Sequence, residues 1–389
     1  MKKIKICFAA AFALMFLAAG CGKKETAEEF AEKWDFNTYQ TFWMPGSDQN
    51  PLQLGEHGYY FFYKGLLNYY EIGREEMVPV CNKPECSHKD STCNALLYGN
   101  TFGSLLMAEE GIYYTTAVSE ENSIFEDLYL IRKDGSGSEF VTRLHENVPS
   151  SSGDMNVDWG EECVDQGILY FTIRDRLESG RNHVSLWRVK TMHNAEPELL
   201  YEEESADLGN FIGDFSVWDG VLYFRHHIYY SDDHWKTELC SYTEKQGVQT
   251  VLEERMTSYC VVGSSIYFTS PDRDGFFQYD MEKKGQVLQI NAELEKDTRF
   301  YWDCQHFFSY PHGQLMEEWD KGKQSEEVEI TVWDLEGKQV DQFSCQNQTN
   351  YFRIYGGTEK YLLVEGKNGI LVYSKDQIGS GKSEWSEWK

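Results

Sequence analysis

Basic residues are scarce in this sequence of 389 residues, which has 36 Lys and Arg against 64 Asp and Glu and a formal net charge of −28. Because a phosphate backbone is bound by clustered Lys and Arg, this deficit argues against nucleic-acid binding. It also argues against electrostatic docking on anionic lipid. The hydrophobic fraction of 41% is too high for a disordered chain. The composition therefore indicates an acidic, folded protein.

Catalytic signatures are also lacking. The sequence contains neither Gly-x-Ser-x-Gly nor His-Glu-x-x-His. Gly379–Ser383 imitates a phosphate-binding loop, but Asp376 stands where the first glycine should be and too few residues follow to form the helix. Asp272–Gly275 opens like a calcium loop without its later ligands, so we interpret it as a turn. We therefore expect no organic cofactor and nominate no catalytic residue.

Long apolar runs are absent except for Ile6–Ala19, which follows Lys2, Lys3 and Lys5. Fourteen residues are too few to span a bilayer, which takes about 20, and the basic flank is typical of an export signal. The run ends Leu-Ala-Ala-Gly before Cys21, which resembles the lipobox of bacterial lipoproteins. That resemblance implies cleavage after Gly20 and a diacylglycerol on the Cys21 sulfur. The alternative is an ordinary signal peptide with an incidental cysteine.

The N-terminal region sets the expected location. Residues 1–20 would be the signal peptide, and residues 21–37 a short tether behind the lipid. Cleavage would remove three lysines and no acid, taking the formal charge from −28 to −31. We therefore expect a protein held at the cell membrane by its lipid, facing outside the cytoplasm.

A short phrase recurs through the rest of the chain, in which turn residues and usually a glycine precede apolar and aromatic residues. Its copies start 44 to 56 residues apart, at Gly58, Gly111, Gly167, Gly220, Ser264 and, more weakly, Gly313 and Lys360. The residues are β-formers in short runs bounded by turns, and a second strand-like run follows each copy. We find no sustained helical periodicity between these units.

Units of about 50 residues with three or four antiparallel strands have the content of a propeller blade. Because one blade cannot bury both of its faces, neighbouring blades must stack. The sequence therefore predicts an all-β fold, a β-propeller over residues 38–378, followed by a flexible tail over 379–389. Seven phrases favour seven blades, with six or eight as alternatives, and two β-sandwiches are the rival fold.

A cysteine cluster follows the second strand of the first unit. Cys81, Cys86, His88 and Cys93 lie within thirteen residues, and three thiolates with one imidazole make a complete tetrahedral set for structural zinc. The alternatives are a disulfide, Cys81–Cys93 or Cys86–Cys93, and free thiols. We interpret the other cysteines of the mature chain as buried core residues.

Together, the lipobox, the acidic tether and the aromatic blade phrases resemble the exported propeller lipoproteins of Gram-positive anaerobes, some of them grouped with TolB-like propellers. Similar Cys-x4-Cys-x-His-x4-Cys loops occur in the first blade of that group. The resemblance implies a fold and a location but no activity.

Histidines gather at His226, His227 and His234, beside two aspartates. Successive strand residues point to opposite faces, so His226 and His227 could not easily bind one ion, and we interpret the segment as a loop at a blade rim.

We expect the protein to be a ligand-binding or protein-interaction module. Its aromatic residues would contact a glycan or an envelope protein. We expect it to act as a monomer. The alternative is a surface hydrolase of glycans or peptides with its active site at the channel mouth.

Overall fold

The computed structural model describes most of the chain between Leu52 and Trp388. The described residues are 52–54, 58–63, 66–71, 76–89, 92–97, 101–120, 123–147, 157–176, 181–205, 210–231, 234–283, 287–291, 293–303, 305–321, 327–346, 352, 354–357, 360–365 and 370–388. All of them belong to one compact unit, 35–389. The expected signal peptide, the tether and Cys21 lie outside the described residues. Within the described residues, no helix is both long enough and apolar enough to cross a membrane.

Seven four-stranded antiparallel sheets make up this unit, and each consists of four strands consecutive in the chain. We number them blades 1 to 7. Blade 1 consists of β1 (Leu52–Leu54), β2 (Gly58–Tyr63), β3 (Leu66–Glu71) and β4 (Glu76–Pro79), and blade 2 of β5 (Thr101–Met107), β6 (Gly111–Glu120), β7 (Ser123–Arg132) and β8 (Ser138–Asn147). Blade 3 consists of β9 (Val157–Asp165), β10 (Ile168–Arg176), β11 (Asn182–Lys190) and β12 (Glu198–Ser205), blade 4 of β13 (Phe211–Trp218), β14 (Val221–Ser231), β15 (His234–Thr243) and β16 (Gly247–Leu252), and blade 5 of β17 (Ser258–Val262), β18 (Ser265–Thr269), β19 (Phe276–Asp280) and β20 (Val287–Asn291). Blade 6 consists of β21 (Arg299–Trp302), β22 (Phe307–Tyr310), β23 (Glu327–Trp333) and β24 (Gln339–Gln346), and blade 7 of β25 (Ile354–Gly357), β26 (Tyr361–Glu365), β27 (Ile370–Ser374) and β28 (Trp385–Trp388).

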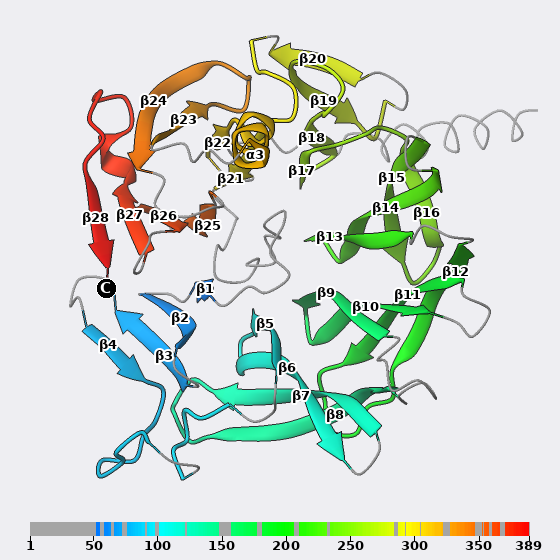
Figure 1. Ribbon diagram of the computed structural model, residues 1–389, viewed down its shortest axis with the longest axis vertical. Helices are drawn as coiled ribbons and strands as arrows, with labels where there is room; N and C mark the ends of the chain where they lie inside the picture. The colour runs from blue at the N-terminus through cyan, green and yellow to red at the C-terminus, as the bar shows by residue number, and fades with distance from the viewer. Residues whose placement is uncertain are drawn as a thin grey trace, which may run out of the picture. The chain divides into compact units, whose positions relative to one another are not determined.

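The blades form a ring, with the first strand of each sheet towards the centre and the fourth at the rim (Figure 1). The predicted all-β propeller with seven blades is thus confirmed, and the two-sandwich alternative is wrong. The recurring phrase is the second strand of its blade, as in β2, β6 and β14. In the part of the chain that the structure describes, blades 1 and 7 each contain only their own consecutive strands, and no strand is exchanged between them.

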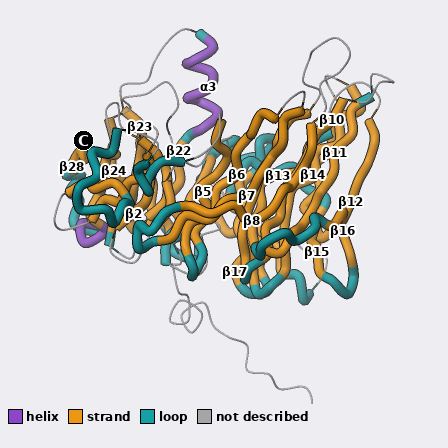
Figure 2. Tube along the Cα trace, turned by 90° about the horizontal axis from the view of Figure 1, so that it is seen from below, coloured by secondary structure: helices purple, strands orange, loops and turns teal. Residues whose placement is uncertain are grey.

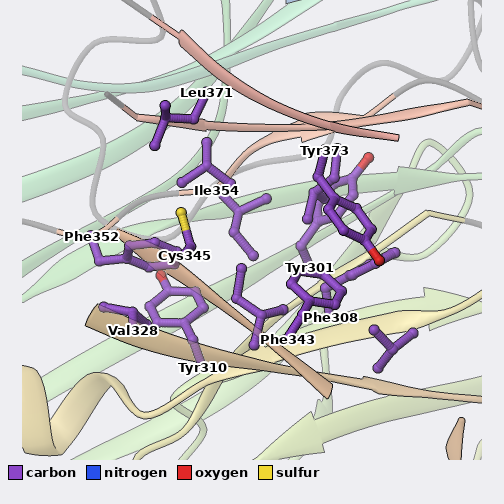
Figure 3. Close-up of a cluster of buried hydrophobic side chains, with 14 residues drawn as sticks. Tyr301, Phe308, Tyr310, Val328, Phe343, Cys345, Phe352, Ile354, Leu371 and Tyr373 are labelled. Carbon is purple, nitrogen blue, oxygen red and sulfur yellow. The ribbon is translucent and has the colours of Figure 1, made fainter. Parts of the chain in front are cut away.

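Apolar cores fill the spaces between adjacent blades. The cluster between blades 6 and 7 is drawn in Figure 3, where Phe343 of β24 stacks on Tyr373 of β27 with ring centroids 4.0 Å apart. Burying each such aromatic side chain stabilises the fold by roughly 1.5–3 kcal/mol. Similar clusters join blades 1 and 2, 2 and 3, 3 and 4, and 7 and 1. Cys163, Cys240, Cys260 and Cys345 are buried, as expected for core cysteines, while Cys304 lies outside the described residues.

Polar contacts also link neighbouring blades. Each joins one blade to the next, and most involve a first or second strand. They are the Thr115 hydroxyl donating to Glu162 at 2.5 Å, the Asp214 backbone N–H donating to Glu161, the Arg225 guanidinium donating to the Met256 carbonyl, the Thr269 hydroxyl donating to the Thr298 carbonyl at 2.5 Å, and the Lys375–Asp303 ion pair at 2.6 Å.

The sixth copy of the phrase was wrongly placed. Residues from Gly313 belong not to a strand but to the helix α3 (His312–Asp320), which projects from one face of the ring in Figure 2. The second strand of blade 6 is instead β22, which directly precedes α3. Gln, Leu, Met and Glu in this segment are good helix formers, and Pro311 stands just before the first turn, where its missing N–H costs nothing.

The expected tail was also misjudged. Residues 375–377 form a 3₁₀ turn, η1 (Lys375–Gln377), and residues 385–388 form β28, which pairs with β27 through Tyr373↔Trp385. The Trp385 ring packs against Phe343 and Tyr373. The prediction missed this strand because few residues follow Gly379, yet β28 completes the last blade and its Trp385 joins the core.

Candidate functional site

The cysteine loop lies between β4 and β5, and it gathers all four predicted ligands. The ligand atoms of Cys81, Cys86, His88 and Cys93 all lie within 4.8 Å of one another. Cys93 is buried and the other three are half-buried, and His88 Nδ1 lies 3.3 Å from Cys93 Sγ. All three cysteines are free thiols here, so neither disulfide considered above is formed in this structure.

Two tight turns shape this loop. The Cys86 backbone N–H donates to the Lys83 carbonyl at 3.1 Å, closing a turn with Pro84 at the position where its fixed φ is favoured. The Leu96 N–H donates to the Cys93 carbonyl at 3.2 Å and closes a second turn. Between them His88 adopts a left-handed φ of 55°, which turns the chain so that its ring reaches the thiols.

The loop is docked on the β7–β8 hairpin of blade 2. The Gly135 carbonyl accepts from the Asn82 backbone N–H at 3.0 Å and from Asn94 Nδ2 at 2.8 Å. Gly135 has a φ of 73°, and a Cβ there would lie 2.7 Å from Asn82 N. The cluster therefore sits on a loop that bridges the first two blades.

The environment of the thiols favours a cation. Burial raises the pKa of Cys81, but N–H donation from Lys83 and Asn94 and contacts with the other two thiols outweigh this, so its pKa is lowered overall. Burial and the neighbouring cysteines raise the pKa of Cys93 to about 11. Three thiolates this close repel one another unless a bound cation compensates their charge.

The histidine segment was wrongly interpreted as a rim loop, because His226 and His227 lie within β14. Their opposite orientation is confirmed: His226 Nε2 contacts Glu203 at 2.8 Å, whereas the His227 ring packs on Phe211 with centroids 5.7 Å apart. Burial of the ring and the nearby Arg225 cation lower the pKa of His227 to about 3, so this half-buried histidine is neutral. His234 starts β15, and its side chain lies outside the described residues.

A cavity of about 460 Å³ opens on blade 6, where it is lined by strands of that blade, by α3 and by the linker 293–298 that leads from blade 5. We call it the blade 5–6 groove. It is lined by polar side chains, among them Glu293, Glu295, Glu327, Glu329, Gln339, Gln342, Ser309 and Thr331, with Trp333 and Tyr310 as its aromatic residues. Ligand sites of small molecules usually have 300–1,000 Å³, so this groove has room for one.

The groove exists because β23 has one polar and one apolar face. Val328, Ile330 and Val332 are buried against blade 7, while the alternate residues Glu327 and Glu329 are exposed. Elsewhere, blades 5 and 6 pack through aromatic rings, with the Phe276 and Phe307 centroids 4.7 Å apart. Sequence reasoning missed this site, although the alternation of Glu and Val in β23 was a visible signal of a strand with a solvated face.

Comparisons with known proteins add likeness of fold only. No protein-family model matches the sequence, and no curated protein matches it. Among solved structures, the chain is similar to the β-propeller domain of the Trilobed protease from Pyrococcus furiosus, which has an open velcro topology, at 9% identity and a TM-score of 0.43, over 87% of this chain and 92% of that one. It is also similar to the Penicillium chrysogenum alpha-L-arabinanase complexed with arabinobiose, at 10% identity and a TM-score of 0.35, over 79% and 98%. A third is the dihydro-heme d1 dehydrogenase NirN, at 12% identity and a TM-score of 0.47, over 97% and 84%. At these levels the activities of these proteins carry no information about this chain.

Proposed function

We propose that this protein is an exported, lipid-anchored propeller that binds a neutral or amino-sugar glycan in the blade 5–6 groove. The observation that carries this proposal is the polar lining of a 460 Å³ groove on the face of blade 6 that is turned away from blade 7. Its acidic and amide side chains converge beside Trp333 in a concave space large enough for a small ligand.

The donors and acceptors in the groove suit a sugar. Carboxylates such as Glu327 and Glu329 accept hydrogen bonds from hydroxyl groups, and Gln339 and Gln342 can both donate and accept. Trp333 forms part of the groove wall, held by its indole N–H donating to Ser309 Oγ at 2.7 Å. Four glutamates in one groove repel an anionic glycan, which limits the ligand to neutral or cationic sugars.

Binding is tested by a glycan array followed by calorimetry with the best hit. We expect Glu329→Ala and Gln342→Ala each to weaken affinity at least tenfold, because each removes hydrogen bonds made inside the groove. Glu336→Ala is the matched control, since Glu336 lies in the β23–β24 turn and does not line the groove. Equal affinities for all three variants, or no glycan bound at all, would contradict the proposal.

A hydrolase is the second candidate, and Glu126 is the observation that favours it. Burial raises the pKa of Glu126 to about 8, and the nearby Glu162 and Asp127 add to the effect. A carboxyl group that stays protonated at neutral pH is what a general acid requires. The groove glutamates, by contrast, are exposed. Hydrolysis of glycan or peptide substrates that is abolished in Glu126→Gln, while binding persists, would favour the enzyme.

The cysteine loop fits zinc in a structural role. Tetrahedral Zn–S bonds of about 2.3 Å place ligand atoms about 3.8 Å apart, which the four ligand atoms within 4.8 Å can reach with small shifts. We expect purified Cys86→Ser to contain about one zinc per chain less than the wild type. Cys345→Ala, at a buried cysteine of β24, is the control and should retain the metal. Equal zinc contents in the two variants would contradict the assignment.

Membrane anchoring rests on the lipobox-like sequence before Cys21. Labelled palmitate should enter the protein in its native host and be absent from Cys21→Ala. Unchanged labelling of the variant would rule out the lipid.

A further inference from the structure

A second group of metal-binding side chains lies between blades 3 and 4, away from the cysteine loop and the groove. The ligand atoms of His226, Glu238 and Cys240 all lie within 4.8 Å of one another. The sheet register explains this: His226 of β14 pairs directly with Glu238 of β15, and Cys240 is two residues further along, on the same face.

We propose that His226, Glu238 and Cys240 bind a zinc-like divalent cation, and that Glu203 of blade 3 orients the histidine from the neighbouring blade. Imidazole, carboxylate and thiolate are the three donor types that zinc takes in proteins. When the ion binds, the Cys240 thiol releases its proton to solvent and the sulfur forms the metal bond.

The surrounding contacts are those of a supported metal site. Glu203 Oε1 lies 2.8 Å from His226 Nε2, and the Tyr201 hydroxyl donates to Glu203 Oε2 at 2.6 Å. The Glu238 carboxylate accepts from Lys236 Nζ at 2.5 Å and from the Thr250 hydroxyl at 3.1 Å. Metal-binding histidines are usually held by a carboxylate and metal-binding carboxylates by further hydrogen bonds, so both supports are already in place.

Two side chains of this site are buried, and two carboxylates remain partly exposed to solvent. The His226 side chain is only 6% exposed and Cys240 is buried, whereas Glu203 and Glu238 retain 21% and 14% exposure. Two carboxylates meet one lysine here, and Lys236 also pairs with Glu253 at 3.1 Å. The excess negative charge in a half-buried pocket is compensated by a divalent cation.

Cobalt(II) alone is the probe, because its bond to a thiolate absorbs in the near ultraviolet and its content can be measured directly. Metal-free protein is titrated with Co²⁺, and bound metal is counted after desalting. We expect Cys240→Ala to bind one equivalent fewer than the wild type and to lose part of the thiolate absorbance. Cys260→Ala, at another buried strand cysteine, should bind as the wild type does.

A gentler variant covers the case in which Cys240→Ala does not fold. Glu203→Gln keeps the shape of its side chain and should weaken Co²⁺ affinity at this site by about 10–100-fold. Cys86→Ser reports separately on the cysteine loop, so loss of one site is distinguished from loss of the other. Equal cobalt contents in the wild type and folded Cys240→Ala, or unchanged affinity in Glu203→Gln, would overturn the proposal.

Discussion

Lys375 and Asp303 form an ion pair that is almost removed from solvent. Their side chains are 7% and 2% exposed, and they join blade 7 to blade 6 at 2.6 Å. Asp303 also accepts from the backbone N–H groups of Gln305 and His306, so its charge is fixed in place. Removing one partner leaves a buried charge uncompensated, which costs more than the pair contributes.

We therefore expect Lys375→Met to lower the free energy of unfolding by about 3–5 kcal/mol, measured by denaturant titration. Lys375→Met combined with Asp303→Asn should recover part of this loss, because no unpaired charge remains. A double variant as unstable as the sum of both single variants would show that the two charges do not interact.

Glu126 makes the free energy of unfolding fall as the pH rises, the opposite of what an ordinary paired carboxylate does. Its pKa is raised from 4.5 to about 8, mainly by burial. Between these values the folded state holds the proton and the unfolded state does not, so stability falls as pH rises through this range.

Glu126→Gln cannot ionise and removes this loss. We expect the variant to exceed the wild type in free energy of unfolding by roughly 2–4 kcal/mol above pH 8, with the difference shrinking towards pH 4.5. Denaturant titrations at several pH values measure it. A difference that stays constant with pH would mean that Glu126 ionises normally in the folded protein.

At the scale of elements, the docking of the cysteine loop on the β7–β8 hairpin depends on Gly135. An alanine there would adopt an unfavourable φ of 73° and would press its Cβ against the backbone of Asn82 and Cys81. We expect Gly135→Ala to cost about 1–3 kcal/mol of stability and to weaken metal binding by the loop.

Gly247→Ala is its matched control. Gly247 has a similar φ of 65°, but nothing lies within 4 Å of a Cβ there, so only the backbone cost of about 1 kcal/mol applies. Equal losses in the two variants, with metal binding intact, would show that the docking contact is unimportant.

Elements were predictable where one strand carried a strong local pattern. The second strands, such as β6 and β14, begin after a turn and are rich in β-branched and aromatic residues. The recurring phrase in the sequence therefore predicted their positions. The first strands were harder to identify. β13 is interrupted at Asp214, which has a φ of 58° and lies in a register shift opposite β14, so its sequence shows no clean alternation.

The candidate sites also differ in whether a local sequence pattern could predict them. The cysteine loop is local in sequence, and its four ligands could be predicted from spacing alone. The blade 5–6 groove and the His226 cluster join residues from different blades or strands, and neither can be found without knowing how the blades stack. His226 was set aside because His227 points away from it, although its true partners lie on β15 and β12.

For the whole propeller, ring closure is the decisive feature. Among the described residues, blades 1 and 7 share no strand, and a cluster of apolar side chains joins them. Tyr59 and Tyr70 of blade 1 pack against Leu363 and Val372 of blade 7, and the two tyrosine rings stack with centroids 5.2 Å apart. Because no backbone ladder links the described strands of the two terminal blades, we expect this junction to be the weakest part of the ring.

We therefore expect Leu363→Ala to cost about 2–5 kcal/mol and to open the ring at this place. Hydrogen exchange should then quicken in β1–β4 and β25–β28 before it does so elsewhere, because each terminal blade loses its partner while the other blades stay stacked. Leu186→Ala is the matched control, since Leu186 is equally buried but lies in the core between blades 3 and 4, where blades on both sides continue the ring. Exchange that quickens in the same strands in both variants would show that the terminal blades are held as firmly as any other pair.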